Sequence, residues 1–366
     1  MPISLLLPNL NGGGTQQVCL RLAREFACCG HTVEFVLMQA KGEFLPKAQR
    51  NWTILDLGVS RGRNVMLPLI RYLRQRQPDA LLVAMWPLTA IAPLAARIAG
   101  FRGKVLVSEH CMLLEEYHSS YSSFNWFSRL ALRPSVVLGY RLASARVGVS
   151  KGLCTEMAAL SWMSPDQFVT IYNPVYPAVS PPLDQLSTVH ALWATEGPRI
   201  LNVANLIPVK NQALLLQAFA ALPDPAARLM LVGRGPEEAA LRALAVALGI
   251  ANRVIFAGFH PDPAPFYATA DLFVLSSDSE GFGNVIVEAL SFGLPVVSTD
   301  CPSGPAEILE GGRYGRLVPP GDALALARAM EEALQAPVDR DSLKRRAADF
   351  APEVAARKYL EVLELV

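Results

Sequence analysis

Two glutamates with seven residues between them, Glu280 and Glu288, flank a glycine-containing turn in the second half of the chain. The apolar run Leu272–Leu275 before them predicts a buried strand, and the pattern after Asn284 predicts a short helix that stops at Gly293. The first N–H groups of a helix find no acceptor within it, so such a turn can hold an anion. The stretch therefore indicates two carboxylates beside a phosphate-sized cradle, with two solvated glutamates on a strand–turn–helix as the simpler interpretation.

A second glycine-rich turn, at residues 12–14, follows the first predicted strand and precedes a helix predicted from Thr15. The arrangement is typical of a dinucleotide fold, but the G-x-G-x-x-G spacing fails because Gln17 holds the third glycine position. We therefore interpret this turn as a place where the backbone closely approaches a ligand, rather than as a nicotinamide site.

Short apolar runs alternate with helical patterns along the chain. Runs that do not alternate with polar residues predict parallel strands whose sheets are covered by helices on both faces. The predicted strands are 3–8, 32–38, 52–55, 80–84, 104–108, 145–149, 168–171, 200–203, 228–232, 253–256, 272–275 and 295–298.

Ligands of such sheets bind beyond the carboxyl ends of the strands. Three features fall at that edge: the glycine turn at 12–14, His110 after the strand 104–108, and Ser150 with Lys151 after a later strand. A histidine there is either a structural hydrogen-bonding residue or a ligand-binding one. Its position at the ligand edge adds weight to the functional interpretation.

The chain has 366 residues, which is enough for two domains with sizeable cores. Residues 173–198 carry five prolines and little periodicity, which predicts a linker. We therefore predict a first domain over 1–176, a linker over 177–198 and a second domain over 199–350. The last stretch, 351–366, predicts a helix that packs on the first domain, since nothing follows it in the chain.

The two halves of the chain differ in charge: residues 1–180 hold 18 Lys and Arg against 10 Asp and Glu, and the remainder holds 15 against 22. Such an asymmetry indicates that the first half faces something anionic. The basic residues lack the interleaved aromatics of a nucleic-acid binder, so no nucleic-acid partner is expected. Six cysteines without C-x-x-C spacing, and an N-terminus without a signal-peptide pattern, predict reduced thiols and a cytoplasmic protein.

The uncharged stretch 80–96 is interrupted by Pro87 and Pro93 and is too short for a membrane span, so it predicts a strand followed by a helix. The polar stretch 111–124 predicts a mobile loop beside the site. Residues 124–133 mix aromatic and arginine side chains, which fits either an amphipathic packing helix or an element on an anionic membrane surface. The second alternative would place a cytoplasmic protein at the inner face of the membrane.

Taken together and in order, the motifs of this chain resemble those of retaining glycosyltransferases with the GT-B fold, in glycosyltransferase family 4. The nine matching regions, each of them short, are 12–14, 108–110, 149–152, 172–175, 203–211, 231–237, 258–259, 279–290 and 304–309. The resemblance implies an α/β fold in which two doubly wound Rossmann-like domains face each other across a cleft and the C-terminal helix returns to the first. Residues 301–305 resemble members that build bacterial surface polysaccharides or lipid-linked oligosaccharides.

This resemblance also implies roles for individual residues. Glu280 would hold hydroxyl groups of the transferred sugar, Lys210 would stabilise the leaving diphosphate, and His110 would contact an outer sugar hydroxyl. These three form the implied catalytic set. Glu288 would accept hydrogen bonds from both ribose hydroxyls. The implied donor-binding set is Gly13, Gly14, Asn205, Lys210, Arg234, Gly258, Phe259, Phe282, Gly283, Asn284, Val285 and Glu288.

The implied reaction is transfer from a nucleotide sugar, with a UDP-hexose or UDP-N-acetylhexosamine favoured, to a glycan or lipid-linked acceptor, without a metal ion or cofactor. No D-x-D cluster is placed to bridge a diphosphate to a cation, so a helix N-terminus and Lys210 would stabilise the leaving group. Asn205 departs from the pattern, because the family most often has an arginine there. That departure keeps open a catalytically silent sugar-nucleotide-binding subunit. An epimerase of the same fold is a further alternative, which the two glutamates disfavour.

Overall fold

The computed structural model describes residues 1–114, 126–194 and 196–365, without the side chains of 126–129. The stretch 111–124, predicted as a mobile loop, therefore lies mostly outside the described residues. Within the described ranges, no helix is both long enough and apolar enough to cross a membrane.

Unit 1, which comprises Met1–Pro174 and Pro352–Val366, is built on a seven-stranded sheet. All paired neighbours in this sheet are parallel, as predicted, and the strand order is β3-β2-β1-β4-β5-β6-β7. Its strands are β1 (Pro2–Leu7), β2 (Thr32–Leu37), β3 (Thr53–Asp56), β4 (Ala80–Ala84), β5 (Lys104–Glu109), β6 (Ala145–Gly148) and β7 (Val169–Thr170). Its helices are α1 (Gly14–Cys28), α2 (Leu45–Gln49), α3 (Met66–Arg76), α4 (Leu88–Ala99), α6 (Trp126–Leu142), α7 (Lys151–Ser161) and α16 (Pro352–Leu363).

Strand β1 shows why this sheet is covered on both faces. Leu5 and Leu7 belong to one buried apolar cluster and Leu6 to another, and all three side chains are fully buried. The first cluster takes in residues of α1 and α16, and the second takes in residues of α3 and α4. A strand that buries both of its faces is a continuous apolar run in the sequence, which is why it could be predicted.

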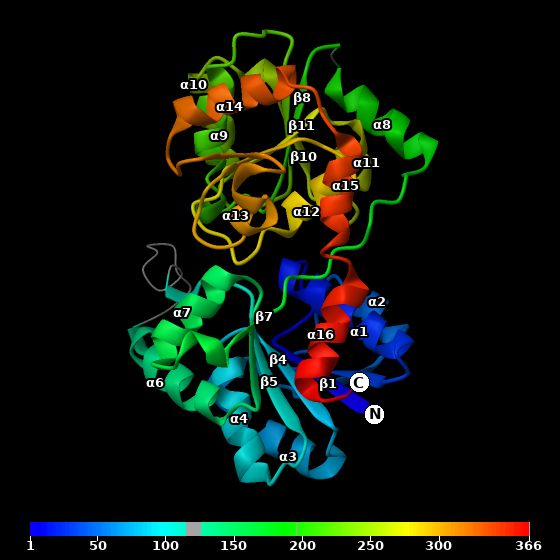
Figure 1. The fold of residues 1–366 in the computed structure, drawn as a ribbon, viewed down its shortest axis with the longest axis vertical. Coiled ribbons are helices and arrows are strands. Elements are labelled where there is room, and N and C mark those ends of the chain that lie inside the picture. Colours follow the sequence, from blue (N-terminus) through cyan, green and yellow to red (C-terminus); the bar gives the residue numbers. More distant parts are fainter. Residues whose placement is uncertain (115–125, 195, 366) are drawn as a thin grey trace. The chain divides into compact units, whose positions relative to one another are not determined.

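Unit 2, Val175–Ala351, is built on a six-stranded parallel sheet of order β10-β9-β8-β11-β12-β13. Figure 1 shows α9, α10 and α14 together on one side of this sheet, where they close its largest apolar cluster. The strands are β8 (Arg199–Val203), β9 (Arg228–Val232), β10 (Val254–Gly258), β11 (Leu272–Leu275), β12 (Val296–Thr299) and β13 (Arg316–Val318). The helices are α8 (Leu183–Trp193), α9 (Gln212–Ala220), α10 (Glu238–Ala247), α11 (Ala264–Thr269), α12 (Asn284–Ser291), α13 (Pro305–Ile308), α14 (Ala323–Gln335) and α15 (Arg340–Ala348).

The segment 177–198, predicted as the domain linker, contains helix α8. Trp193 anchors this helix: its side chain is buried, and its Nε1 donates a hydrogen bond to Thr269 Oγ1 of α11 at 3.0 Å. Only Val189 and Trp193 are buried along the whole helix. Two buried positions give too weak a periodic pattern to predict a helix. The three-residue strand β13 was also not predicted.

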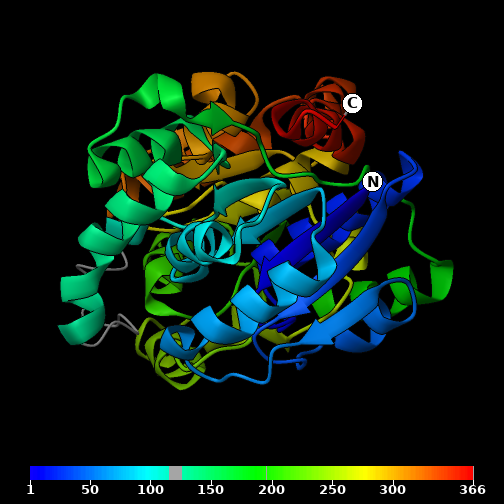
Figure 2. The same cartoon turned by 90° about the horizontal axis from the view of Figure 1, so that it is seen from below.

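The last helix, α16, packs on unit 1, as expected for a chain that returns to its first half. The rings of Tyr359 in α16 and Phe26 in α1 meet edge to face, with centroids 6.5 Å apart. Figure 2 shows both chain ends at the same end of unit 1, and Met1 and Leu365 line one surface cavity there.

The strand order reverses once in each sheet. In unit 1 the neighbours β1 and β4 lie at the reversal, and in unit 2 the neighbours β8 and β11 do. Crossover connections leave such a pair in opposite directions, which opens a crevice at the carboxyl ends of the two strands. The loops after these strands are therefore the first place to look for a ligand site.

Candidate active site

An ion pair joins the loops that follow β8 and β11 in unit 2. Lys210 Nζ lies 2.6 Å from Glu280 Oε1, and Ser277 Oγ donates a hydrogen bond to the same oxygen at 2.7 Å. The lysine side chain is 23% exposed and the glutamate side chain 10%. Two residues predicted to act on different parts of a substrate thus contact each other at the reversal point of the sheet.

Hydrogen bonds between the two loops fix this pair. The backbone N–H of Asp278 donates to Val209 O at 2.9 Å, and Ser276 Oγ donates to Lys210 O at 2.9 Å. From the neighbouring strand β12, Thr299 Oγ1 donates to Ser277 O at 2.6 Å. The charged side chains therefore extend from a braced backbone rather than from an independent loop.

Two glycines shape the turn before α12: one lies in the turn, and the other, which precedes α13, packs against it. Gly283 has φ +100° and immediately precedes the helix, which begins at Asn284 as predicted. Gly304 has φ +86°, and a Cβ there would lie 1.9 Å from Phe282 O. Phe282 itself is buried with its ring 5.5 Å from that of Phe350, so only its backbone can meet a ligand. The first turn of α12 therefore presents backbone N–H groups beside the ion pair.

Glu288 lies within α12, and its carboxylate is held by a buried tyrosine. Tyr267 OH donates a hydrogen bond to Glu288 Oε2 at 3.1 Å. The tyrosine ring stacks on that of Phe292, with centroids 5.7 Å apart and an interplanar angle of 17°. The carboxylate is thus oriented by the core of unit 2.

The other predicted donor contacts of unit 2 lie on the loops after β8, β9 and β10. The guanidinium carbon of Arg234 lies 4.6 Å from the centre of the Phe259 ring, which gives a cation–π contact next to Gly258. Asn205 is exposed, and its backbone carbonyl oxygen accepts a hydrogen bond from Gln212 Nε2 at 3.1 Å.

In unit 1, the predicted glycine turn forms the start of α1. Gly13 is the residue before this 15-residue helix, Gly14 is its first residue, and the first turn contains no acidic side chain. A Cβ on Gly13 would lie 2.5 Å from Gln16 Oε1, so the turn is closely packed. The helix N-terminus suits an anion, as predicted from its position.

His110 follows β5 at the same edge of the unit 1 sheet. Its Nε2 lies 3.1 Å from Ser108 Oγ, and its Nδ1 is buried without a hydrogen-bond partner among the described residues. Burial lowers the pKa of His110 to about 4, and the nearby Asn173 side chain offsets this only in part. The imidazole is therefore neutral at neutral pH.

The neighbouring Glu109 is fully buried as well. Its Oε1 accepts hydrogen bonds from Thr89 Oγ1 and from Tyr140 OH, the latter at 2.7 Å, and its Oε2 has no partner among the described residues. Burial raises the pKa of Glu109 to about 7. Burial thus shifts the pKa values of two adjacent residues at the ligand edge in opposite directions, and each shift favours the neutral form.

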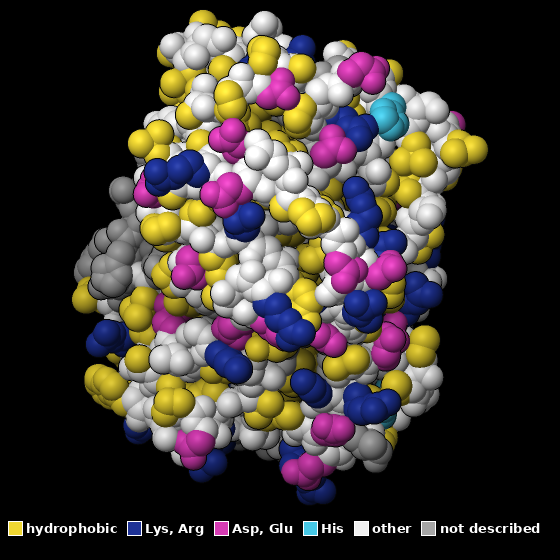
Figure 3. All heavy atoms as spheres, turned by 45° about the horizontal axis from the view of Figure 1, so that its top comes forward, with side chains coloured by type: hydrophobic (Ala, Val, Ile, Leu, Met, Phe, Trp, Pro, Cys, Tyr) yellow, Lys and Arg dark blue, Asp and Glu magenta, His cyan; other side chains and the backbone are white. Residues whose placement is uncertain are grey.

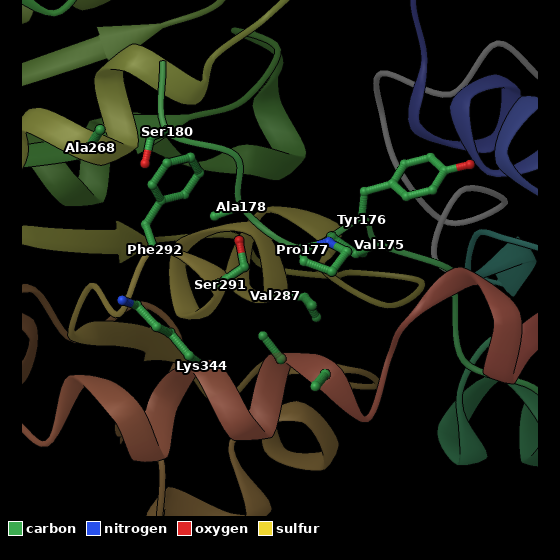
Figure 4. A pocket seen from close by; sticks show the side chains of 12 residues that line it. Val175, Tyr176, Pro177, Ala178, Ser180, Ala268, Val287, Ser291, Phe292 and Lys344 are labelled. Atoms are coloured by element: carbon green, nitrogen blue, oxygen red, sulfur yellow. The ribbon is translucent and has the colours of Figure 1, made fainter. Parts of the chain in front are cut away.

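A cavity of about 390 Å³ lies elsewhere in unit 2, between the segment 175–180 and helices α11, α12 and α15. Figure 4 shows the side chains of Lys344 and Phe292 pointing into it. None of the predicted site residues lines this cavity. Among the described side chains, no cluster of three or more His, Cys, Asp or Glu could hold a metal ion.

Three contacts that orient the predicted residues were missed from the sequence: Ser277 on Glu280, Tyr267 on Glu288, and Ser108 on His110. Ser108 lies within a matched motif and Ser277 lies two residues before one, so their positions in the sequence gave some indication of a role at the site. Tyr267 contacts a residue 21 positions away in sequence through the packing of α11 against α12, and no local pattern indicates that contact.

Comparison with known proteins identifies the family. Residues 189–350 match the family described as "Glycosyl transferases group 1", and residues 12–179 match the one described as "Glycosyltransferase Family 4". The lipopolysaccharide core biosynthesis glycosyltransferase LpsE of Rhizobium meliloti (strain 1021) is 31% identical over 245 residues, which span 64% of this chain and 68% of that relative. The chain belongs to glycosyltransferase family 4.

Further similarities agree with this family. N-acetyl-alpha-D-glucosaminyl L-malate synthase of Bacillus anthracis is 30% identical to this family 4 chain over 276 residues, spanning 75% of the chain and 68% of the relative. The crystal structure of HepE from Anabaena in complex with UDP-glucose matches over 100% of both chains with a TM-score of 0.84 and 23% identity, which supports the GT-B fold. The enzyme is therefore a hexosyltransferase that acts on a nucleotide-sugar donor, as the motifs predicted.

The raised pKa of Glu109 predicts a pH-dependent stability. Between about pH 4.5 and 7, folded Glu109 keeps a proton that the unfolded chain has lost, so its contribution to the free energy of unfolding falls as pH rises and is constant above 7. Glu109→Gln removes this contribution. The variant should therefore gain on the order of 3 kcal/mol relative to the parent between pH 4.5 and 7.5, since one pKa unit is about 1.4 kcal/mol.

Urea unfolding of parent and variant at several pH values measures this difference. Glu361→Gln, which replaces an exposed glutamate on α16, is the matched control and should show a constant difference. A parent–variant difference for Glu109→Gln that does not change across the range would mean that the buried carboxyl titrates normally.

Proposed function

We propose that this enzyme is a retaining glycosyltransferase that takes its sugar from a UDP-hexose or UDP-N-acetylhexosamine, without a metal ion, and passes it to a glycan or lipid-linked acceptor. The observation that carries the proposal is the Lys210–Glu280 ion pair at the strand-order reversal, beside the N-terminus of α12. A UDP donor is supported by HepE, which was crystallised with UDP and with UDP-glucose. The acceptor class is supported by LpsE and by a Campylobacter jejuni relative named as a diphospho-undecaprenol N-acetylgalactosaminyltransferase.

The donor diphosphate would lie at the N-terminus of α12. Backbone N–H groups from Phe282 to Val285 and the ammonium group of Lys210 would stabilise its charge. Negative charge grows on the leaving group as the bond to the anomeric carbon breaks, so a cation there acts mostly in the transition state. The same groups supply the charge stabilisation for which other enzymes use a divalent cation.

The remaining donor contacts of unit 2 follow from the same placement. Glu280 would exchange its lysine partner for hydroxyl groups of the transferred sugar. Glu288 would accept hydrogen bonds from the ribose hydroxyls, since a carboxylate takes two donors at once. The cation–π contact of Arg234 with Phe259, beside Gly258, would lie against the base.

In unit 1, we assign Gly13 and Gly14 to a phosphate contact at the start of α1, and His110 to an outer hydroxyl of the sugar. A neutral imidazole suits this role, because a hydroxyl needs a hydrogen-bond partner rather than a charge. Asn205 brings no cation to the diphosphate, so in unit 2 we assign the stabilisation of the leaving group mainly to Lys210 and the N-terminus of α12.

The first experiment offers UDP, GDP and ADP sugars with and without a glycan acceptor and follows the release of nucleotide diphosphate. We expect release from a UDP sugar that depends on the acceptor. Lys210→Ala should lower this turnover by on the order of 10²- to 10³-fold, as when one donor to a developing negative charge is lost. Lys344→Ala, at the separate cavity, is the charge-matched control and should stay near the parent.

Each contrary outcome has a definite meaning. No release from any donor would identify a silent binding subunit, and release of free sugar without an acceptor would identify an epimerase-like enzyme. Turnover of Lys210→Ala within threefold of the parent would place the diphosphate elsewhere.

Glu288→Ala tests the ribose contact directly. Hydrogen bonds to charged groups are worth about 1.5–3 kcal/mol, so affinity for UDP should fall by roughly 10- to 150-fold. Calorimetric titration with UDP measures the change, and Glu332→Ala on α14 is the control because it removes a glutamate from another face of the unit. Affinity for UDP within twofold of the parent would reject the assignment of Glu288.

We also propose that a surface of unit 1 contacts an anionic membrane; the aromatic side chains of the segment 124–133, on which this prediction rested, lie outside the described residues. Leu130 and Leu138 on α6 are 66% and 49% exposed, and Trp162 after α7 is 69% exposed. Arg133 and Arg141 are exposed on the same helix, and Arg141 Nη2 donates to Trp162 O at 3.5 Å. Exposed tryptophan, leucine and arginine together are typical of a side chain set that binds at a membrane interface. On the face shown in Figure 3, by contrast, basic and acidic side chains are interspersed.

Replacing the two arginines of this surface tests the proposed contact. Each basic residue near an anionic surface contributes about 1 kcal/mol, so Arg133→Gln with Arg141→Gln should weaken binding to anionic liposomes by roughly 30-fold at low salt. Sedimentation measures binding, and Arg357→Gln with Lys358→Gln on α16 carries the same change of charge as a control. Binding that is equal for neutral liposomes, or equal for both double variants, would count against this surface.

A further inference from the structure

A chain of hydrogen bonds connects the last helix of the protein to His110. Tyr359 OH of α16 lies 3.0 Å from Ser108 Oγ of β5, and Ser108 Oγ lies 3.1 Å from His110 Nε2. Tyr359 and Ser108 are 1% and 0% exposed, so water does not compete for these contacts. Tyrosine and serine are 251 positions apart in the sequence.

The chemistry of the three groups sets the direction of the chain. Ser108 has one hydroxyl proton and two acceptor lone pairs. If it accepted from both neighbours, its fully buried proton would be left without an acceptor, which is costly, so it accepts from one of them and donates to the other. A phenol is a stronger donor and a weaker acceptor than an aliphatic hydroxyl, so Tyr359 donates to Ser108. Ser108 then donates to His110 Nε2, which therefore carries no proton. In a neutral imidazole the proton must then reside on Nδ1.

We propose that Tyr359 is a positioning residue, which acts through Ser108 to hold His110 in one ring orientation and in the Nδ1–H tautomer. The inference rests on the proposed function, in which His110 contacts the transferred sugar. In this proposal α16 has a function beyond packing, because its Tyr359 determines which ring nitrogen of His110 is a hydrogen-bond donor. Fixing a tautomer through the other ring nitrogen is a general way in which proteins orient histidine.

Packing alone is the alternative explanation for Tyr359, since its ring also meets Phe26. Tyr359→Phe separates the two roles, because the ring remains and only the hydroxyl is lost. Ser108→Ala removes the middle hydroxyl without touching the core ring and tests the same chain. Tyr72→Phe is the matched control, since Tyr72 OH bonds Ser4 Oγ and Glu34 elsewhere in unit 1.

Long-range ¹H–¹⁵N correlation spectra of the full chain, labelled at its 5 histidines, report the tautomer directly. A His110→Gln spectrum assigns the signal of His110. We expect the Nδ1–H tautomer in the parent and in Tyr72→Phe, and a mixture with Nε2–H in Tyr359→Phe and Ser108→Ala. Turnover with a UDP sugar should fall about 10-fold in Tyr359→Phe, while affinity for UDP, which lacks the sugar, stays within twofold.

An Nε2–H tautomer in the parent, or a tautomer unchanged in both Tyr359→Phe and Ser108→Ala, would overturn the inference. The spectra need no substrate, so this failure is distinguishable from that of the proposed function. A tautomer that responds to Tyr359→Phe in a protein without transferase activity would support the hydrogen-bond chain and reject the role of His110 in sugar transfer.

Discussion

The reversal of strand order in each parallel sheet is the constraint on which the rest of the structure depends. Neighbouring strands β8 and β11 send their connections in opposite directions, so the edge between them stays uncovered by either crossover. Backbone hydrogen bonds must then brace the two exposed loops against each other, and a lysine and a glutamate meet above them. Two glycines serve the turn into α12: Gly283 has the positive φ of +100° at its end, and Gly304 leaves room for the backbone of Phe282 within it.

The Lys210–Glu280 ion pair is partly exposed, so a ligand could separate its two charged groups more easily than those of a fully buried pair. Both side chains retain some exposure, 23% for the lysine and 10% for the glutamate, so water partly screens the attraction between them. A fully buried pair would be costly to break, because each partner would be left as an uncompensated charge. The loops hold the two groups in place, and a ligand with hydroxyl and phosphate groups can take over both at small cost.

Elements with continuous apolar runs could be predicted from the sequence almost to the residue, as 80–84, 228–232 and 272–275 show. Their burial on both faces leaves a local pattern that needs no knowledge of the partner. Helix α8 could not be predicted, because Trp193 is fixed by a contact with Thr269 that the local pattern does not contain. The motif residues Lys210 and Glu280 were found, but not their mutual contact, since that depends on the pairing of strands 72 positions apart. The role of Tyr359 could not be predicted either, because its contact with Ser108 joins residues 251 positions apart in the sequence.

The chain leaves unit 1 at Pro174 and re-enters it only at Pro352, and this has a consequence for synthesis on the ribosome. The seven strands of the first sheet are complete when fewer than half of the residues have been made. Tyr359 and its neighbours in α16 cover an apolar surface of α1. That surface stays exposed until all of unit 2 has been translated. The first half of the protein is thus the last to finish folding, and any ribosome that stalls in the second half releases a chain with an open core.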